Sequence, residues 1–191
     1  MYYSMRTLTL VALGSNATSS FGTPKEIIDH AIATIESRLG TTCEKSPIYR
    51  TPCFPKGAGP DYANAVIRFE TNLEPSKILH QLHEIETEFG RVRTKRWGER
   101  TLDLDLLCHG DTILPDDTEV LHWMNLPISE QTQIAPNQLI LPHPRIQDRA
   151  FVLVPMAMVA PNWRHPVLHK TVIDMRDALP QTEIEEVVLY D

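Results

Sequence analysis

Two amphipathic helices constrain what this chain can fold into more than any other feature of its sequence. The first is predicted to begin at Thr23-Pro24-Lys25-Glu26, a capping box with Pro at the first helical position, and to end at Gly40. The second is predicted from Pro75 to Gly90. Their predicted buried positions recur at helical spacing: Ile28, Ile32, Ile35 and Leu39 in the first helix, and Ile78, Leu82, Ile85 and Phe89 in the second. Each helix therefore needs an apolar surface to cover.

Short apolar segments around these helices are typical of β-strands. They are TLTLVALG at residues 7–14, residues 43–50, residues 63–70, and LDLDLL at residues 102–107. The order strand, helix, strand, strand, helix, strand predicts a ferredoxin-like α+β sandwich, in which both helices lie on one face of an antiparallel sheet. We also expect C-terminal helices at about residues 149–159 and 171–179, together with extra short strands.

Length and charge limit the kind of protein. The 191 residues fit a single domain, residues 1–191, with an irregular insertion at about residues 114–141. The formal net charge of −7 argues against nucleic acid or an anionic membrane surface as a partner. No stretch is long and apolar enough to span a membrane.

Cysteine and histidine spacing gives no sign of disulfides or of a structural metal. The cysteines show no C-x-x-C spacing and are expected to be free thiols in a reducing cytoplasm: Cys43, Cys53 and Cys108. The N-terminal segment lacks the basic leading region of a signal peptide, although an organellar form cleaved of its leader would look similar. Two histidine pairs lack a third ligand and are expected at surface or edge positions: His80 with His83, and His165 with His169.

The segment RVRTKRWGERTLDLDLLC places a run of cations directly before two aspartates. In LDLDLL the leucines alternate with Asp103 and Asp105, so both carboxylates share one strand face, with Cα atoms roughly 6–7 Å apart. Two adjacent carboxylates repel one another and indicate a positive partner. Mg²⁺ with a polyphosphate fits, because Mg²⁺ binds one or two carboxylates plus phosphate oxygens while arginines hold the remaining charge. The alternative is a solvated sheet face whose aspartates pair with neighbouring arginines. The sequence contains no G-x-x-x-x-G-K-[ST], so such a site would have no P-loop.

Five stretches together resemble a known family. ALGSN, YRTP, PDYANAV, GRVRTKRWGERTLDLDLL and LPHPR followed by DRAFVLVP are similar, in order and spacing, to the hydroxymethyldihydropterin pyrophosphokinases of folate synthesis. The similarity runs from about Leu8 to His169, and its most specific part is R-W-G-x-R-T-L-D-x-D. The resemblance implies transfer of pyrophosphate from ATP to 6-hydroxymethyl-7,8-dihydropterin with release of AMP. It also implies two Mg²⁺ ions as cofactor. A monomer is expected, although the sequence does not determine the oligomeric state, and association with other folate-pathway enzymes stays open.

The resemblance assigns roles around ATP. Asp103 and Asp105 would hold both metal ions and are predicted to be catalytic together with Arg91, Arg93 and Arg100. The predicted ATP-binding residues are Glu86, Arg91, Arg93, Arg96, Arg100, Leu106, His143 and Arg149.

The resemblance also assigns a pterin site. Tyr62 and Phe151 would sandwich the ring, although either residue taken alone would be interpreted as a core aromatic. The other predicted pterin-binding residues are Thr51, Pro52 and Phe54 along one wall, Asn64 at the ring edge, Asp103, and Trp97 on a loop that closes over the site.

Three departures from the family pattern stand out. The basic loop is one residue shorter than in the common bacterial form, so either Thr94 or Lys95 takes the place of the usual lysine. The segment 114–141 is longer than in compact members. Pro144 stands where an aromatic residue is common near the adenine, which argues against stacking there.

Two other classes of protein compete with this interpretation. A ferredoxin-like sheet with a basic loop could be an RNA-binding module, but the aromatics of such modules are missing and the chain is acidic. A phosphohydrolase of the D-x-D-x-T type also uses paired aspartates. Here Leu107 stands where that motif has Thr, and the motif lies in the middle of the chain.

Overall fold

The computed structural model describes residues 6–53, 57, 59–91, 100–127, 130 and 133–191. The predicted site residues Phe54, Arg93, Arg96 and Trp97, and with them Thr94 and Lys95, lie outside the described residues. Their assigned roles therefore stay predictions.

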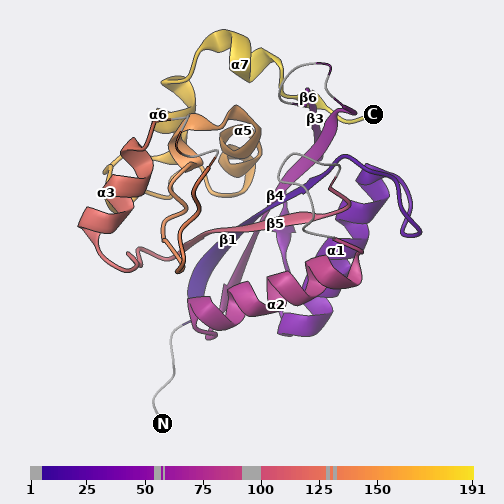
Figure 1. Ribbon diagram of the computed structural model, residues 1–191, viewed down its shortest axis with the longest axis horizontal. Coiled ribbons are helices and arrows are strands. Elements are labelled where there is room, and N and C mark those ends of the chain that lie inside the picture. Colours follow the sequence, from indigo (N-terminus) through magenta and orange to yellow (C-terminus); the bar gives the residue numbers. More distant parts are fainter. Residues whose placement is uncertain (1–5, 54–56, 58, 92–99, 128–129, 131–132) are drawn as a thin grey trace.

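The strands form one antiparallel sheet. Its central strands are β1 (Thr7–Ser15) and β4 (Tyr62–Thr71), with β5 (Asp103–His109) on the other side of β1. The sheet order is β5-β1-β4-β3-β6, and β2 (Glu44–Lys45) pairs with β4 alongside β3 (Tyr49–Thr51). The edge opposite β5 is β6 (Val188–Leu189), near the C-terminus (Figure 1). The predicted strand order and antiparallel pairing are confirmed, except that the segment 43–50 forms two short strands.

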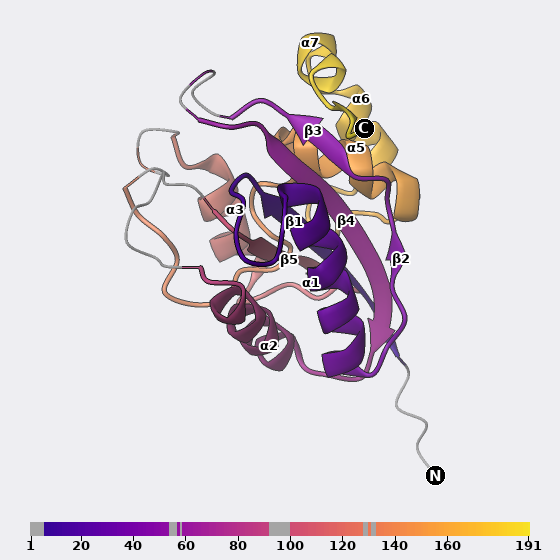
Figure 2. The ribbon, with the colours of Figure 1, turned by 90° about the vertical axis from the view of Figure 1, so that its right-hand side faces the viewer.

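Helices α1 (Pro24–Leu39) and α2 (Pro75–Glu88) lie together on one face of the sheet (Figure 2). The capping box at Thr23 is present, and Gly40 ends α1 with a left-handed conformation at φ 59° that disfavours residues with a side chain. The predicted buried stripes are confirmed, with Leu39 only partly buried. They pack on Val11 and Leu13 of β1 and on Leu104 and Leu106 of β5 in one hydrophobic core.

The opposite face of the sheet is covered as well. Helices α5 (Ala150–Val159) and α6 (Val172–Asp177) pack there in a second hydrophobic cluster. The sheet contributes Leu10, Val66, Leu107 and Cys108 to that cluster. The sequence analysis predicted these helices without placing them, and the structure shows a three-layer arrangement (Figures 1 and 2).

The segment 114–141 is not wholly irregular, contrary to expectation. It contains α3 (Asp117–Asn125), which begins because the Asp116 side chain accepts a hydrogen bond from the Glu119 N–H at 2.9 Å. Leu114 and Leu141, the two ends of the segment, hydrogen-bond to each other through their main chains. The remaining short elements are η1 (Ile146–Asp148) and α7 (Gln181–Glu185).

Candidate active site

Strand β5 presents the two predicted metal ligands on one face. Asp103 lies opposite Gly14 of β1 and Asp105 lies opposite Ala12. The alternating leucines are buried in the core, as predicted, while the side chains of Asp103 and Asp105 keep 18% and 39% of their surface exposed. Both carboxylates are therefore held by a buried strand and still reach the surface.

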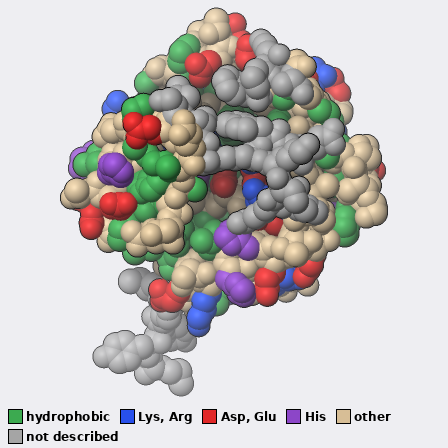
Figure 3. All heavy atoms as spheres, viewed as in Figure 1, with side chains coloured by type: hydrophobic (Ala, Val, Ile, Leu, Met, Phe, Trp, Pro, Cys, Tyr) green, Lys and Arg blue, Asp and Glu red, His purple; other side chains and the backbone are tan. Residues whose placement is uncertain are grey.

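Three arginines from separate parts of the chain surround these carboxylates. Arg91 Nη2 lies 2.6 Å from one oxygen of Asp103, and Arg100 pairs with the other oxygen. Arg149, at the start of α5, places its Nη1 3.7 Å from Asp105. Figure 3 shows acidic and basic side chains close together near the centre of this face, over the position of β5 in Figure 1. The pairing of aspartates with neighbouring arginines, which the alternative interpretation expected, is present, with Arg149 as an additional partner.

Glu86, near the end of α2, connects this cluster to the main chain of β5. Its side chain is 1% exposed, accepts a hydrogen bond from the Leu104 N–H at 2.8 Å, and forms an ion pair with Arg91. One buried carboxylate thus holds both the main chain of β5 and a guanidinium that contacts Asp103. The predicted contact of Glu86 with ATP stays a prediction.

Burial and neighbouring charge shift two pKa values in the cluster. Burial, with the adjacent Asp105 charge, raises the pKa of Asp103 against the opposing effect of Arg100 and Arg91. Burial, with Arg149 nearby, lowers the pKa of His143 to about 3. His143 is therefore neutral at pH 7. Because its Nδ1 accepts the Arg145 N–H at 3.1 Å, its Nε2 carries the hydrogen and can only donate.

The predicted pterin-side residues Tyr62 and Asn64 converge with Asp103 at Gly14. A Cβ at Gly14 would lie 3.3 Å from Asn64 Oδ1 and 3.9 Å from atoms of both Asp103 and Tyr62. Asn64 donates to Thr51 Oγ1 at 2.7 Å, which orients its amide. Because Gly14 has no side chain, these three residues can approach its main chain closely.

Phe151 is not a core aromatic. It is 40% exposed, and the Arg149 guanidinium lies over its ring, 5.6 Å from the centroid. Arg149 therefore links Phe151 to Asp105. Tyr62 is half-buried in β4, and burial raises the pKa of its phenol. Pro52 is also partly exposed, whereas the Leu106 side chain lies in the core, so only the main chain of Leu106 can reach a ligand.

One residue of this site was not assigned from the sequence. Asn16 ends the ALGSN stretch and hydrogen-bonds to Arg100 and to Pro60. The available signal was an Asn after Gly-Ser at the end of a predicted strand, which is typical of a turn. That pattern does not identify the distant partners.

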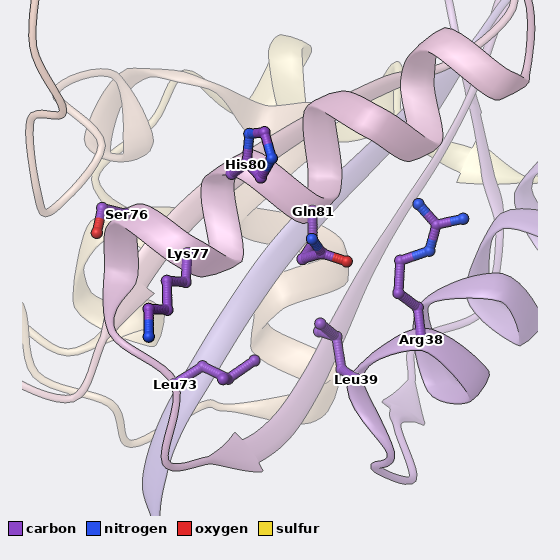
Figure 4. A pocket seen from close by; sticks show the side chains of 7 residues that line it. All are labelled: Arg38, Leu39, Leu73, Ser76, Lys77, His80 and Gln81. Carbon is purple, nitrogen blue, oxygen red and sulfur yellow. The ribbon is translucent and has the colours of Figure 1, made fainter.

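A separate hollow of about 400 Å³ lies between the end of α1 and the start of α2 (Figure 4). Its side chains include Leu39, Leu73, Lys77 and His80, and none of the described residues that line it is a carboxylate. Helix α2 has 14 residues and is about 20 Å long. The hollow lies at the start of this helix, whereas Glu86 lies near its end. We do not assign this hollow to the chemistry of the aspartates.

The described residues contain no group of three or more His, Cys, Asp or Glu side chains that could hold a metal ion. A cation at Asp103 and Asp105 would therefore take its other ligands from substrate and water. Mg²⁺ sites in proteins are commonly completed in this way. Within the same residues, no helix combines the length and apolar character needed to cross a membrane.

An α+β sheet that gathers two carboxylates and three arginines at one edge strand is the arrangement of an enzyme that transfers phosphate groups. Residues 10–161 match the family model described as 7,8-dihydro-6-hydroxymethylpterin-pyrophosphokinase (HPPK). The chain belongs to this family. The family, the enzyme class and the reaction predicted from the sequence are confirmed, and the RNA-binding and phosphohydrolase alternatives are wrong.

Relatives and solved structures agree with this assignment. The 2-amino-4-hydroxy-6-hydroxymethyldihydropteridine pyrophosphokinase of Synechocystis is 34% identical over 176 residues, which cover 92% of this chain and 77% of the relative. That of Pseudomonas aeruginosa is 39% identical and covers 82% of each chain. A Plasmodium falciparum HPPK-DHPS structure superposes with a TM-score of 0.65 at 15% identity. This chain spans 44% of that longer chain, so the comparison shows the fold alone.

Proposed function

We propose that the Asp103–Asp105 face of β5 is the place where this pyrophosphokinase transfers the terminal pyrophosphoryl group of ATP to the hydroxymethyl oxygen of its pterin substrate, with AMP as the leaving group. The observation that carries the proposal is the shared face of the two aspartates, bordered by Arg91, Arg100 and Arg149. A solvated face would not need a buried Glu86 to hold one of these arginines.

Asp103 and Asp105 are proposed to hold Mg²⁺, two ions by family resemblance. The donor set fits, because two partly exposed carboxylates leave the remaining coordination positions to water and phosphate oxygens. When bound, Mg²⁺ neutralises phosphate oxygens and favours loss of the proton from a coordinated hydroxyl.

The arginines are proposed to exchange partners when substrate binds. Arg91 and Arg100 neutralise Asp103 in the described structure. A cation at that carboxylate would compete with them, which leaves their forked N–H groups to bind phosphate oxygens. Arg149, beside Asp105, and the Nε2–H of neutral His143 would supply further donors. Arg93 and Arg96 are proposed to join them.

The pterin is proposed to lie over Gly14, with its ring edge at Asn64 and its faces against Tyr62 and Phe151. Because Asn64 donates to Thr51, its Oδ1 remains as an acceptor for a ring N–H. The same position lies beside Asp103, where the hydroxymethyl group must meet the phosphate. Main-chain groups of Thr51 and Pro52, with Phe54 and Trp97, would complete the walls.

The proposed setting is a cytoplasmic monomer that acts on small molecules, with association with other folate-pathway enzymes left open. The net charge of −7 supports the expectation that neither nucleic acid nor an anionic membrane surface is a partner.

The test is pterin-dependent AMP release from MgATP. Asp103→Asn or Asp105→Asn should each lower the rate by a factor on the order of a thousand or more, because a ligand charge is lost from the cation. Asp111→Asn is the matched control, since this exposed aspartate follows β5 and should leave the rate unchanged. Near-normal AMP release by either site variant would show that the aspartates do not bind the catalytic cation.

A further inference from the structure

Asn16 lies where two separate loops end. One loop follows β3 and returns to β4 through Pro60, just before Tyr62. The other follows α2 and enters β5 after Arg100. Asn16 directly follows β1, which lies between β4 and β5, and it is 6% exposed.

The Asn16 amide bonds to both loops at once. Its Oδ1 accepts the main-chain N–H of Arg100 at 2.8 Å, and the main-chain N–H of Asn16 donates to the Arg100 carbonyl at 3.0 Å. Its Nδ2 donates to the Pro60 carbonyl at 3.4 Å. A main-chain N–H can only donate and a carbonyl can only accept, so these two partners fix the orientation of the amide. A side chain with only one of these functions cannot satisfy both partners.

The segment that follows Asn16 is anchored to the helices. Ser19 and Gly22 hydrogen-bond to each other, and the Phe21 ring stacks on Phe89 at the end of α2 with centroids 4.4 Å apart. The Phe21 carbonyl also contacts His30 Nδ1 of α1 at 3.1 Å. Asn16 is thus tied to the packed helical layer, and the two loops meet it from either side.

The two loops lead to different parts of the proposed site. Arg100 carries its guanidinium to Asp103, on the phosphate side. Pro60 lies two residues before Tyr62, on the pterin side. We propose that Asn16 is a positioning residue that holds these two loop ends in a fixed relative position. When bound nucleotide orders Arg100, Asn16 thereby favours the arrangement of Tyr62 that binds the pterin. This inference rests on the proposed function for which side takes which substrate.

The experiment measures pterin affinity by isothermal titration, with and without saturating Mg²⁺ and a non-hydrolysable ATP analogue. Wild type should bind the pterin on the order of tenfold more tightly when nucleotide is present, a magnitude usual for coupled sites. Asn16→Ala should bring that ratio close to one. Asn16→Asp is nearly isosteric and keeps the acceptor for Arg100 but loses the donor for Pro60. It should retain nucleotide binding and lose most of the coupling.

Ser15→Ala is the control, because the neighbouring Ser15 hydroxyl is buried without a hydrogen-bond partner among the described residues. It should keep the wild-type ratio. A wild type without coupling, or Asn16 variants that lose both affinities equally and keep the ratio, would overturn the inference. AMP release is measured in parallel: wild type that fails to release AMP contradicts the proposed function, whereas active enzyme with unchanged coupling in Asn16→Ala contradicts only the role of Asn16.

Discussion

At the scale of single residues, Phe151 shows how exposure separates a surface aromatic from a core position. An exposed phenylalanine forfeits about 1.5–3 kcal/mol of burial free energy, so a core role would have hidden it. Its ring is instead 40% exposed under Arg149, which also reaches Asp105. Tyr62 is half-buried, and its ring would lie 3.9 Å from a Cβ at Gly14. The two aromatics therefore reach the proposed site from different elements, β4 and α5.

Tyr62→Ala and Phe151→Ala should each weaken pterin binding by about 1–3 kcal/mol through lost stacking and apolar contact, with ATP affinity little changed. Titration calorimetry with each ligand separately measures both affinities. Met158→Ala is the control for Phe151, because Met158 is another exposed apolar residue of α5 and should not affect the pterin. Equal losses for both ligands would mean that the rings support the fold instead of the pterin.

At the scale of secondary-structure elements, the junction between α2 and β5 organises the charges. Helix α2 ends next to Arg91, and Glu86 joins that guanidinium to the main chain of β5 at Leu104. A buried carboxylate without its partner would be costly, so the helix end and the strand are held in one relative position.

Glu86→Gln should slow AMP release and destabilise the protein, because the amide can still accept from Leu104 but no longer neutralises Arg91. We expect a loss of about 3 kcal/mol in the free energy of unfolding, typical of a buried pair that loses one charge. Urea unfolding measures it. Glu88→Gln on the same helix removes only an exposed pair with Arg38 and should cost about 0–1 kcal/mol. Indistinguishable results for the two variants would show that the Glu86 charge is dispensable.

At the scale of the whole molecule, the segment between α5 and α6 contains a buried histidine that is not assigned to the proposed site. His165 is fully buried, and its Nδ1 accepts hydrogen bonds from the N–H groups of Val167 and Leu168, both at 3.2 Å. Burial, with His169 nearby, lowers the pKa of His165 to about 4. The folded protein therefore keeps this imidazole neutral where the unfolded chain would bind a proton.

The sign of the resulting pH dependence follows from proton uptake. Below the unfolded pKa of about 6.5 the unfolded state binds an additional proton, so the free energy of unfolding falls as the pH drops toward the folded pKa. Between pH 7 and pH 5 the ceiling for His165 is about 2 kcal/mol. His165→Asn keeps an acceptor for the two N–H groups and cannot titrate. It should therefore show a smaller loss of stability over this range.

Urea unfolding at pH 7, 6 and 5 measures this difference. His80→Asn, at an exposed position of α2, should behave like wild type. If His165→Asn loses as much stability as wild type between pH 7 and pH 5, the histidine does not cause the dependence.

The sequence alone determined the features that depend on neighbouring residues. The capping box at Thr23 and the glycine at Gly40 mark the two ends of α1, because a cap forms its hydrogen bonds within one turn of the helix. The alternation in LDLDLL placed Asp103 and Asp105 on one face because strand side chains alternate. The helix at Asp117 escaped prediction even though its cap is local, because Pro- and Asn-rich flanks dominate the pattern of residues 114–141.

Only the tertiary structure decided which distant residues meet. Asn16 and Arg100 are 84 positions apart, and their bonds exist because β1 and β5 pair antiparallel with Gly14 opposite Asp103. Arg149 reaches Asp105 because α5 packs on the face of the sheet opposite α1 and α2. Periodicity records which side of an element is apolar but carries no information on which partner covers it. The packing of the three layers therefore assembled the carboxylates, arginines and loop ends into one site.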